Sequence, residues 1–179
     1  MHIHLIKKYY FINKFDTNNI DKQDRQTAII FRNYSSKRED ENLIVKIKNY
    51  CKKKSLKFYL SNNIKLAVKL SLDGAYIPAF NKSFMHNSYS LKKNFKFLGS
   101  AHNLKQIRHK EKQKVGNIFL SPIFLTKNYK SKLGIYKLLN LKKNTKTEIT
   151  CLGGINYKNI NIIKMINIRN IAGITLFEN

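Results

Sequence analysis

The sequence predicts an α/β fold in which eight parallel strands alternate with helices and close into a compact (β/α)8 TIM barrel. Short blocks of β-branched and aromatic residues recur eight times along the 179 residues, and longer amphipathic stretches lie between them. No Pro-, Gly- or Ser-rich linker divides the chain, which predicts a single domain over residues 1–179. An open doubly wound sheet is the alternative, but the sequence contains neither a GxGxxG motif nor a P-loop to support a nucleotide-binding version.

The predicted strands are apolar blocks bounded by polar or glycine-containing segments. In chain order they cover residues 9–15, 27–31, 56–60, 74–77, 95–98, 117–120, 148–152 and 171–176. The crossovers between parallel strands need helices, and most of the intervening segments are long enough to form them. Because the sequence ends directly after the eighth strand, we expect a barrel that lacks a final helix.

The predicted helices repeat their apolar residues at the spacing of one helical face. They cover residues 40–53, 63–71, 104–114, 131–141 and 158–166. The first of them carries Leu43, Ile44, Ile47 and Cys51 on one face and lysines on the other. Residues 18–26 and 81–94 are polar and predict either a broken helix or a loop.

The formal net charge is +25, from 35 basic and 10 acidic residues. Such an excess usually indicates a polyanionic partner. Here the lysines are spread over every segment, and the heavy use of Lys, Asn, Ile, Tyr and Phe is typical of an AT-rich codon pool. We therefore expect no nucleic-acid partner, although a diffuse positive field also attracts phosphorylated small molecules.

Cellular location and redox chemistry are read from what the sequence lacks. No apolar run reaches the roughly 20 residues of a membrane span, and the first residues do not form a signal peptide. These observations predict a cytoplasmic protein without a membrane partner. Cys51 and Cys151 are far apart and form no CxxC motif, so we expect two buried core residues rather than a disulfide or a zinc site.

The active face of a parallel barrel is built by residues that follow the carboxyl ends of the strands. The candidates are hydroxyls, amides, cations and glycines, namely Arg32, Asn62, Asn81, Ser100, His102, Ser121, Thr126, Lys130, Gly153 and Gly154. This set contains no carboxylate. The sequence therefore does not support a mechanism that uses paired carboxylates as acid and base.

Two of these features allow more than one interpretation. Gly153 and Gly154 follow the seventh strand, where glycine serves either as a cradle for phosphate or simply as a turn. His102 is the only histidine on the predicted active face, either as a proton or hydrogen-bond donor or as a polar residue at the start of the next helix. No carboxylate is available to orient it as part of a catalytic dyad.

Several short segments together resemble a known family. They are DGAYI at 73–77, GSAHNL at 99–104, LSPIFLT at 120–126, LGGIN at 152–156 and IAGI at 171–174. In this order and spacing they resemble the thiamine phosphate synthase and thiazole tautomerase superfamily over roughly residues 9–177. The resemblance implies a compact eight-stranded barrel that handles phosphorylated pyrimidine and thiazole compounds.

The synthases of that superfamily join hydroxymethylpyrimidine pyrophosphate to thiazole phosphate and release pyrophosphate. The resemblance implies catalytic roles for Arg32, Ser100 and Lys130. Together with the positions of these residues on the predicted active face, the resemblance implies substrate or phosphate binding by His102, Ser121, Thr126, Gly153 and Gly154. The tautomerases carry a catalytic histidine where this chain has Pro122, so that activity is not expected.

The two metal-holding positions of the family correspond to Asn62 and Asn81, where amides replace carboxylates. Magnesium is the cofactor that the resemblance implies, but an amide binds it without neutralising its charge, and we assign no metal ligand. Two functions follow: a thiamine phosphate synthase, or a degenerate barrel that binds a phosphorylated thiazole or thiamine precursor without turnover. The sequence decides neither whether the protein is an enzyme nor whether it forms a homo-oligomer.

Overall fold

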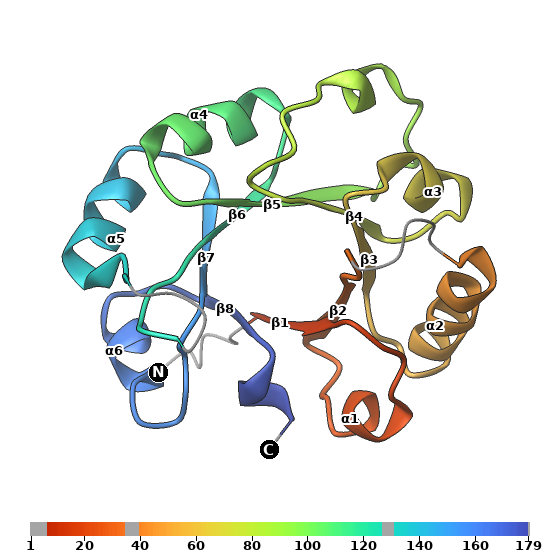
Figure 1. The fold of residues 1–179 in the computed structure, drawn as a ribbon, viewed down its shortest axis with the longest axis horizontal. Coiled ribbons are helices and arrows are strands. Elements are labelled where there is room, and N and C mark those ends of the chain that lie inside the picture. Colours follow the sequence, from red (N-terminus) through yellow and green to blue (C-terminus); the bar gives the residue numbers. More distant parts are fainter. Residues whose placement is uncertain (1–6, 35–39, 127–130, 179) are drawn as a thin grey trace.

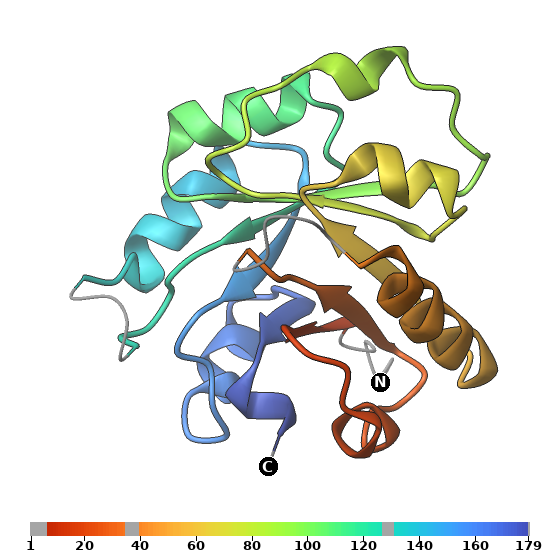
Figure 2. The ribbon, with the colours of Figure 1, turned by 45° about the vertical axis from the view of Figure 1, so that its right-hand side comes forward.

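The computed structural model describes residues 7–34, 40–126 and 131–178. Its eight strands form a closed barrel in which each strand lies beside the next one in sequence. Strand β1 pairs in parallel with both β2 and β8, which closes the ring. Figures 1 and 2 show the strands as a central ring with the helices around its outside. The predicted fold class is confirmed, and the open sheet is excluded.

The eight strands fall close to their predicted positions. They are β1 Lys7–Ile12, β2 Thr27–Phe31, β3 Phe58–Ser61, β4 Gly74–Ile77, β5 Lys96–Ala101, β6 Asn117–Leu120, β7 Glu148–Leu152 and β8 Asn170–Gly173. The largest difference lies at β1, which was expected to run on to Phe15. Instead, the Asp16 carboxylate caps the following helix, and the Phe15 ring packs edge-on against Tyr50 outside the strand, at 5.5 Å.

The outer layer consists mainly of short helices. They are α1 Thr17–Asp21, α2 Glu41–Lys53, α3 Ile64–Lys69, α4 Leu104–Lys112, α5 Gly134–Lys143 and α6 Ile160–Met165, with 3₁₀ helices η1 Met85–Ser88 and η2 Thr175–Phe177. The two polar segments with an ambiguous pattern thus contain α1 and η1. In α2 the predicted apolar face is confirmed: Ile44, Ile47 and Cys51 are buried, and Leu43 is partly buried against the same core.

The segment after β8 packs on the outside of the barrel. It was expected to extend the strand to residue 176, but it turns into η2, whose Leu176 and Phe177 are buried. The Phe177 ring lies 5.6 Å from that of Tyr10, and the Phe177 carbonyl accepts a 2.8 Å hydrogen bond from Gln23 Nε2. The apolar pattern that resembled a strand therefore covers the outside of the barrel next to α1.

The inside of the barrel is filled by aromatic and aliphatic side chains. Phe119 lies near the centre, and its ring makes edge-to-face contacts with Tyr9, Phe11 and Tyr76 at centroid distances of 4.9, 6.0 and 5.3 Å. A second, larger apolar cluster lies between the strands and the outer helices. The barrel is thus a packed core with no central channel, as expected for eight strands.

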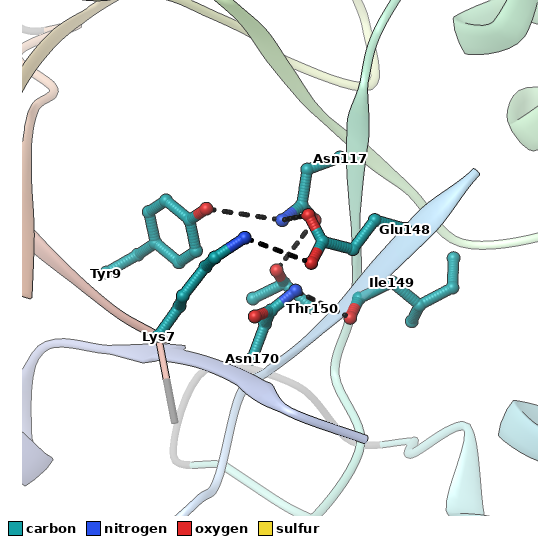
Figure 3. Close-up of polar contacts among 7 residues, drawn as sticks. All are labelled: Lys7, Tyr9, Asn117, Glu148, Ile149, Thr150 and Asn170. Carbon is teal, nitrogen blue, oxygen red and sulfur yellow. Dashed lines mark hydrogen bonds and ion pairs between the residues drawn. The ribbon is translucent and has the colours of Figure 1, made fainter. Parts of the chain in front are cut away.

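Polar side chains close the end of the barrel at which the strands begin (Figure 3). Asn117 Nδ2 donates to Tyr9 Oη and to Glu148 Oε2, both at 3.2 Å, and Asn117 Oδ1 accepts from Thr150 Oγ1 at 2.7 Å. Burial and the charge of Glu148 raise the pKa of Tyr9 to about 12, so its hydroxyl stays neutral. Because these residues lie at the end opposite to the active face, we assign them a role in stability.

Replacing Thr150 with valine tests this network. The substitution keeps the shape of a fully buried side chain but leaves Asn117 Oδ1 without its hydroxyl donor. We expect the free energy of unfolding to fall by about 1–2 kcal/mol, measured by urea denaturation. Thr175→Val, at an exposed position in η2, should change it by less than about 0.5 kcal/mol. Equal stabilities of the two variants would contradict the assignment.

Both cysteines are free and buried, as predicted. Burial raises the pKa of each thiol to about 12, which keeps Cys51 and Cys151 protonated and unreactive at neutral pH. Within the described part of the chain, no helix combines the length and the apolar composition that crossing a membrane requires.

Candidate functional site

Strand alternation sends a ring of polar side chains to the mouth of the barrel. Successive inward positions lie two residues apart, and the interior cluster includes Ile30, Tyr59, Leu98 and Phe119. Two residues further along these four strands stand Arg32, Ser61, Ser100 and Ser121. The predicted residues Arg32, Ser100 and Ser121 therefore face the same end of the barrel, above its aromatic interior.

Arg32 lies over an aromatic platform at this mouth. Its guanidinium carbon is 5.2 Å from the centre of the Phe11 ring and 5.9 Å from that of Tyr34. The Tyr34 hydroxyl is hydrogen-bonded to Ser61 Oγ at 2.8 Å, and the ring of Phe80 packs against Tyr34 at 5.6 Å. A permanently charged group on a half-buried aromatic surface is well suited to bind an anionic ligand.

A cavity of about 1050 Å³ opens beside this platform, where β2, β3 and β4 end. Its walls include the aromatic rings of Tyr34 and Phe80, the amides of Asn62 and Asn81, and the side chain of Lys65. The volume is large enough for a drug-sized or cofactor-sized ligand. The cavity therefore lies at the face where enzymes of this fold bind their substrates.

The two amides at the family metal positions are hydrogen-bonded to each other. Asn81 Nδ2 donates to Asn62 Oδ1 at 2.9 Å, and the Ser83 backbone N–H donates to Asn81 Oδ1 at 2.9 Å. Magnesium prefers several oxygen ligands with at least one carboxylate. Within residues 7–34, 40–126 and 131–178, no group of three His, Cys, Asp or Glu residues is placed to hold a metal ion. These residues therefore do not fit a magnesium site.

A buried lysine holds the loop that carries Asn81. Lys110, in α4, is 1% exposed, and its Nζ donates to the carbonyls of Pro78 and Asn81 and to Gln113 Oε1 at 2.7, 2.9 and 2.8 Å. Gln113 Nε2 adds bonds to the carbonyls of Asn81 and Ser83. Burial lowers the pKa of Lys110 to about 8, but at pH 7 the ammonium is retained and supplies all three protons.

Ser100 connects β5 to the same loop. Its Oγ accepts a 2.9 Å hydrogen bond from the Ala79 backbone N–H, and the side chain is almost fully buried. A serine hydroxyl that accepts one bond still has its own proton to donate. Ser100 is therefore able to hold the loop after β4 and to donate to a ligand oxygen at the mouth, and its predicted catalytic role stays a prediction.

Ser100→Ala should separate these two roles. The change leaves the Ala79 N–H without its acceptor, and we expect a loss of about 1–2 kcal/mol in unfolding free energy, measured in urea. Ser100→Cys keeps a weak acceptor at the same position and should lose less stability. An unchanged stability of Ser100→Ala would show that this hydrogen bond does not hold the loop.

The loops after β6 and β7 form one unit across the mouth from the cavity. Gly153 and Gly154 both have positive φ, +93° and +71°, and a Cβ on Gly154 would lie 2.6 Å from the carbonyl oxygen of Leu125. The Phe124 N–H donates to the Gly153 carbonyl at 3.0 Å. Glycine is thus required here by the close approach of two backbones, whatever the loop binds.

Thr126 follows this contact and carries an unused polar atom. Its Oγ1 is buried and has no hydrogen-bond partner among the described residues. Buried hydroxyls without a partner are rare, and such an atom at a barrel mouth is a candidate ligand contact. The predicted phosphate-binding role of Thr126 and of the two glycines stays a prediction, with this orphaned hydroxyl in its favour.

His102 and Ser121 bind each other at the ends of β5 and β6. The ring Nδ1 of His102 lies 2.6 Å from the Ser121 carbonyl, which can only accept, so Nδ1 carries the proton. The backbone N–H of His102 donates to Gln106 Oε1 at 2.7 Å. These bonds give His102 a structural link between strands, and its predicted part in substrate binding stays a prediction.

Lys130 lies outside the described residues, so its predicted role is not addressed by the structure. Sequence reasoning missed three parts of the site: the buried Lys110, the aromatic wall at Phe80, and the ion pair between Glu41 and Lys69 at the cavity edge, 2.8 Å. Lys110 could have been found, because it follows the buried Ile107 by three residues on the same face of α4. Nothing local to the sequence indicates the other two.

Comparisons with known proteins identify the family and the fold of the chain. The family model described as thiamine monophosphate synthase matches residues 20–177. The "Putative thiamine-phosphate synthase 2" of Aquifex aeolicus (strain VF5) is 26% identical over 144 residues, which cover 78% of this chain and 76% of that protein.

Two solved structures share the fold. Thiamine phosphate pyrophosphorylase from Pyrococcus furiosus matches with a TM-score of 0.76 and 17% identity, over 95% of this chain and 86% of that one. The pyrophosphorylase from Bacteroides thetaiotaomicron matches with a TM-score of 0.65 and 15% identity, over 96% and 84%. The family model spans the barrel from the end of α1 to η2 and leaves out only β1 among the strands. The chain therefore belongs to the thiamine monophosphate synthase family.

Proposed function

We propose that this chain is a transferase that joins hydroxymethylpyrimidine pyrophosphate to thiazole phosphate. The observation that carries the proposal is the position of Arg32, on the Phe11 and Tyr34 rings at the barrel mouth, next to a cavity of about 1050 Å³. Family membership supports the substrate class, and the cavity is large enough for a phosphorylated ligand.

In this reaction the bond between the pyrimidine methylene carbon and the pyrophosphate oxygen breaks, and the electron pair leaves with pyrophosphate. The lone pair of the thiazole nitrogen then forms the new carbon–nitrogen bond. Negative charge grows on the leaving group, and Arg32 is suited to stabilise it there. The Ser100 hydroxyl supplies a further donor. On the other side, Thr126 Oγ1 and the backbone at Gly154 are suited to hold the thiazole phosphate.

A second function is favoured by one specific observation. The amides of Asn62 and Asn81 stand where the family places metal-binding carboxylates, and they bind each other. A barrel that has lost those carboxylates could retain phosphorylated thiazole or thiamine precursors without turning them over. Such a protein would be stabilised by thiamine phosphate or thiazole phosphate in a thermal-shift assay, because a ligand that binds only the folded state raises its melting temperature.

The test is formation of thiamine phosphate from both substrates by the purified protein, followed chromatographically. We expect Arg32→Ala and Lys130→Ala each to lower kcat/KM by at least about tenfold, which corresponds to 1.4 kcal/mol of transition-state stabilisation. Lys137→Ala, an exposed change on the outer helix α5, serves as the control and should leave the rate unchanged.

Wild-type protein that forms no product under any condition would overturn the transferase assignment. A thermal shift with thiazole phosphate in that same preparation would then favour the binding function. Turnover that is unaffected by both variants would instead place the pyrophosphate elsewhere in the barrel.

A further inference from the structure

The charges that line the cavity favour an anion without help from a metal. Among the described lining residues, Glu41 is the only carboxylate, and both of its oxygens lie against Lys69 Nζ, at 2.8 and 2.9 Å. Lys65 adds a second cation to the wall, and Arg32 lies against Tyr34 at its edge. The cavity therefore presents a positive surplus, which is what a phosphorylated ligand needs for direct binding.

The amide pair is oriented so that each amide oxygen already accepts one hydrogen bond from the protein. A backbone N–H can only donate, so the bond from Ser83 N fixes Asn81 Oδ1 as its acceptor. Asn81 Nδ2 must then donate to Asn62, whose Oδ1 accepts at 2.9 Å. Asn62 Nδ2 has no partner within the described part of the chain. The pair thus offers an N–H donor to a ligand, whereas a cation would have to share oxygens that already accept a hydrogen bond.

The pair is also held in place by the protein itself. The Asn81 carbonyl accepts from Lys110 Nζ at 2.9 Å and from Gln113 Nε2 at 3.1 Å. Asn62 has a φ of +68°, a left-handed conformation that asparagine and aspartate tolerate better than most residues. Metal ligation is therefore not needed to order these two loops, and donors fixed in advance bind an anion at lower entropic cost.

We infer that this cavity binds a diphosphate group directly, through the Asn62–Asn81 amide pair and the neighbouring cations, without a divalent metal ion. The inference rests on the proposed function for the identity of the group, because a diphosphate is the leaving group of that reaction. It departs from the metal-dependent binding that the family resemblance implies.

Isothermal titration with inorganic pyrophosphate tests the inference on the full chain. We expect wild-type protein to bind pyrophosphate in EDTA with an affinity within about threefold of that in magnesium. The double variant Asn62→Asp, Asn81→Asp places two carboxylates beside the anion. Its affinity in EDTA should fall by at least about tenfold through charge repulsion, and magnesium should restore it.

The control is the double variant Asn161→Asp, Asn167→Asp, which adds the same charge at exposed positions away from the cavity. Asn167 also has a positive φ, +54°, so it matches the backbone of Asn62. This variant should bind pyrophosphate like wild type in both buffers. Direct binding of Mn²⁺, measured by electron paramagnetic resonance, should appear in the cavity double variant and be absent from wild type.

Wild-type binding that requires magnesium would overturn the inference, and so would an absence of pyrophosphate binding in both buffers. Pyrophosphate binding in EDTA by a protein that forms no thiamine phosphate would support the inference while the proposed transferase fails. Turnover that is abolished by EDTA would support the proposed transferase and contradict the metal-free binding of the diphosphate. The binding and turnover assays therefore distinguish the two proposals.

Discussion

Lys110→Met is expected to lower the free energy of unfolding by about 3 kcal/mol, measured by urea denaturation at pH 7. The ammonium makes three charge-assisted hydrogen bonds, to the carbonyls of Pro78 and Asn81 and to Gln113 Oε1. Methionine donates no hydrogen bond, so the substitution removes all three donors at once. A buried acceptor left without its donor costs about 1–3 kcal/mol, and more when the lost donor was charged.

The loss of stability in Lys110→Met arises mainly at one buried acceptor atom. The Pro78 carbonyl keeps a bond from the Asn81 N–H, and the Asn81 carbonyl keeps one from Gln113 Nε2. Gln113 Oε1 is left without its donor in a fully buried side chain. We therefore expect the loop after β4 to loosen locally, with a weaker affinity for ligands of the adjoining cavity. Lys112→Met, at an exposed position on α4, should change stability by less than about 0.5 kcal/mol.

The same lysine predicts a pH dependence. Its pKa is about 8 in the folded protein and 10.5 when unfolded, so between these values the unfolded chain binds more protons. Folding stability from this group therefore rises as the pH rises from 8 to 10.5, by at most about 3 kcal/mol. The difference in unfolding free energy between wild type and Lys110→Met should therefore increase over this pH range. Parallel pH profiles, or an equal stability of Lys110→Met and Lys112→Met, would contradict the assigned contacts.

The fold could be predicted from the sequence because its strands are set by local patterns. The block at 27–31, for example, is β-branched or aromatic at every position except Ala28, and β2 is buried at every position. The errors at Phe15 and Leu176 have one cause. An apolar residue beyond a strand end can be buried by packing on the outside of the barrel, as the contacts of Phe15 with Tyr50 and of Phe177 with Tyr10 show.

The site was only partly predictable, for a related reason. Strand ends identify which residues reach the mouth, so Arg32, Ser100 and Ser121 were found. Local sequence patterns do not predict contacts between residues that are far apart in the sequence. The hydrogen bond between Asn62 and Asn81 joins residues 19 apart, and that from Lys110 to Pro78 joins residues 32 apart. A lysine in a helix rich in lysines looks exposed until the loop it supports is in view.

Gly154→Ala is expected to destabilise the protein by about 3 kcal/mol and to abolish binding of thiazole phosphate. A Cβ at this position would lie 2.6 Å from the Leu125 carbonyl oxygen and 2.8 Å from the Phe124 carbonyl carbon. Both atoms belong to the backbone, so a side-chain rotation cannot relieve the contact. The loops after β6 and β7 must separate, which displaces the buried Thr126 hydroxyl from its position at the mouth.

Gly134→Ala is the matched control. Gly134 has a φ of +73°, close to the +71° of Gly154, but a Cβ there has no neighbour within 4 Å among the described residues. Both alanines carry the strain of a left-handed backbone, roughly 1–2 kcal/mol. Only the alanine at position 154 would also contact another loop. Gly134→Ala should therefore lose about 1 kcal/mol and retain ligand binding. Equal losses in urea would mean that backbone strain alone explains the glycine, and the contact between the two loops would then have no energetic role.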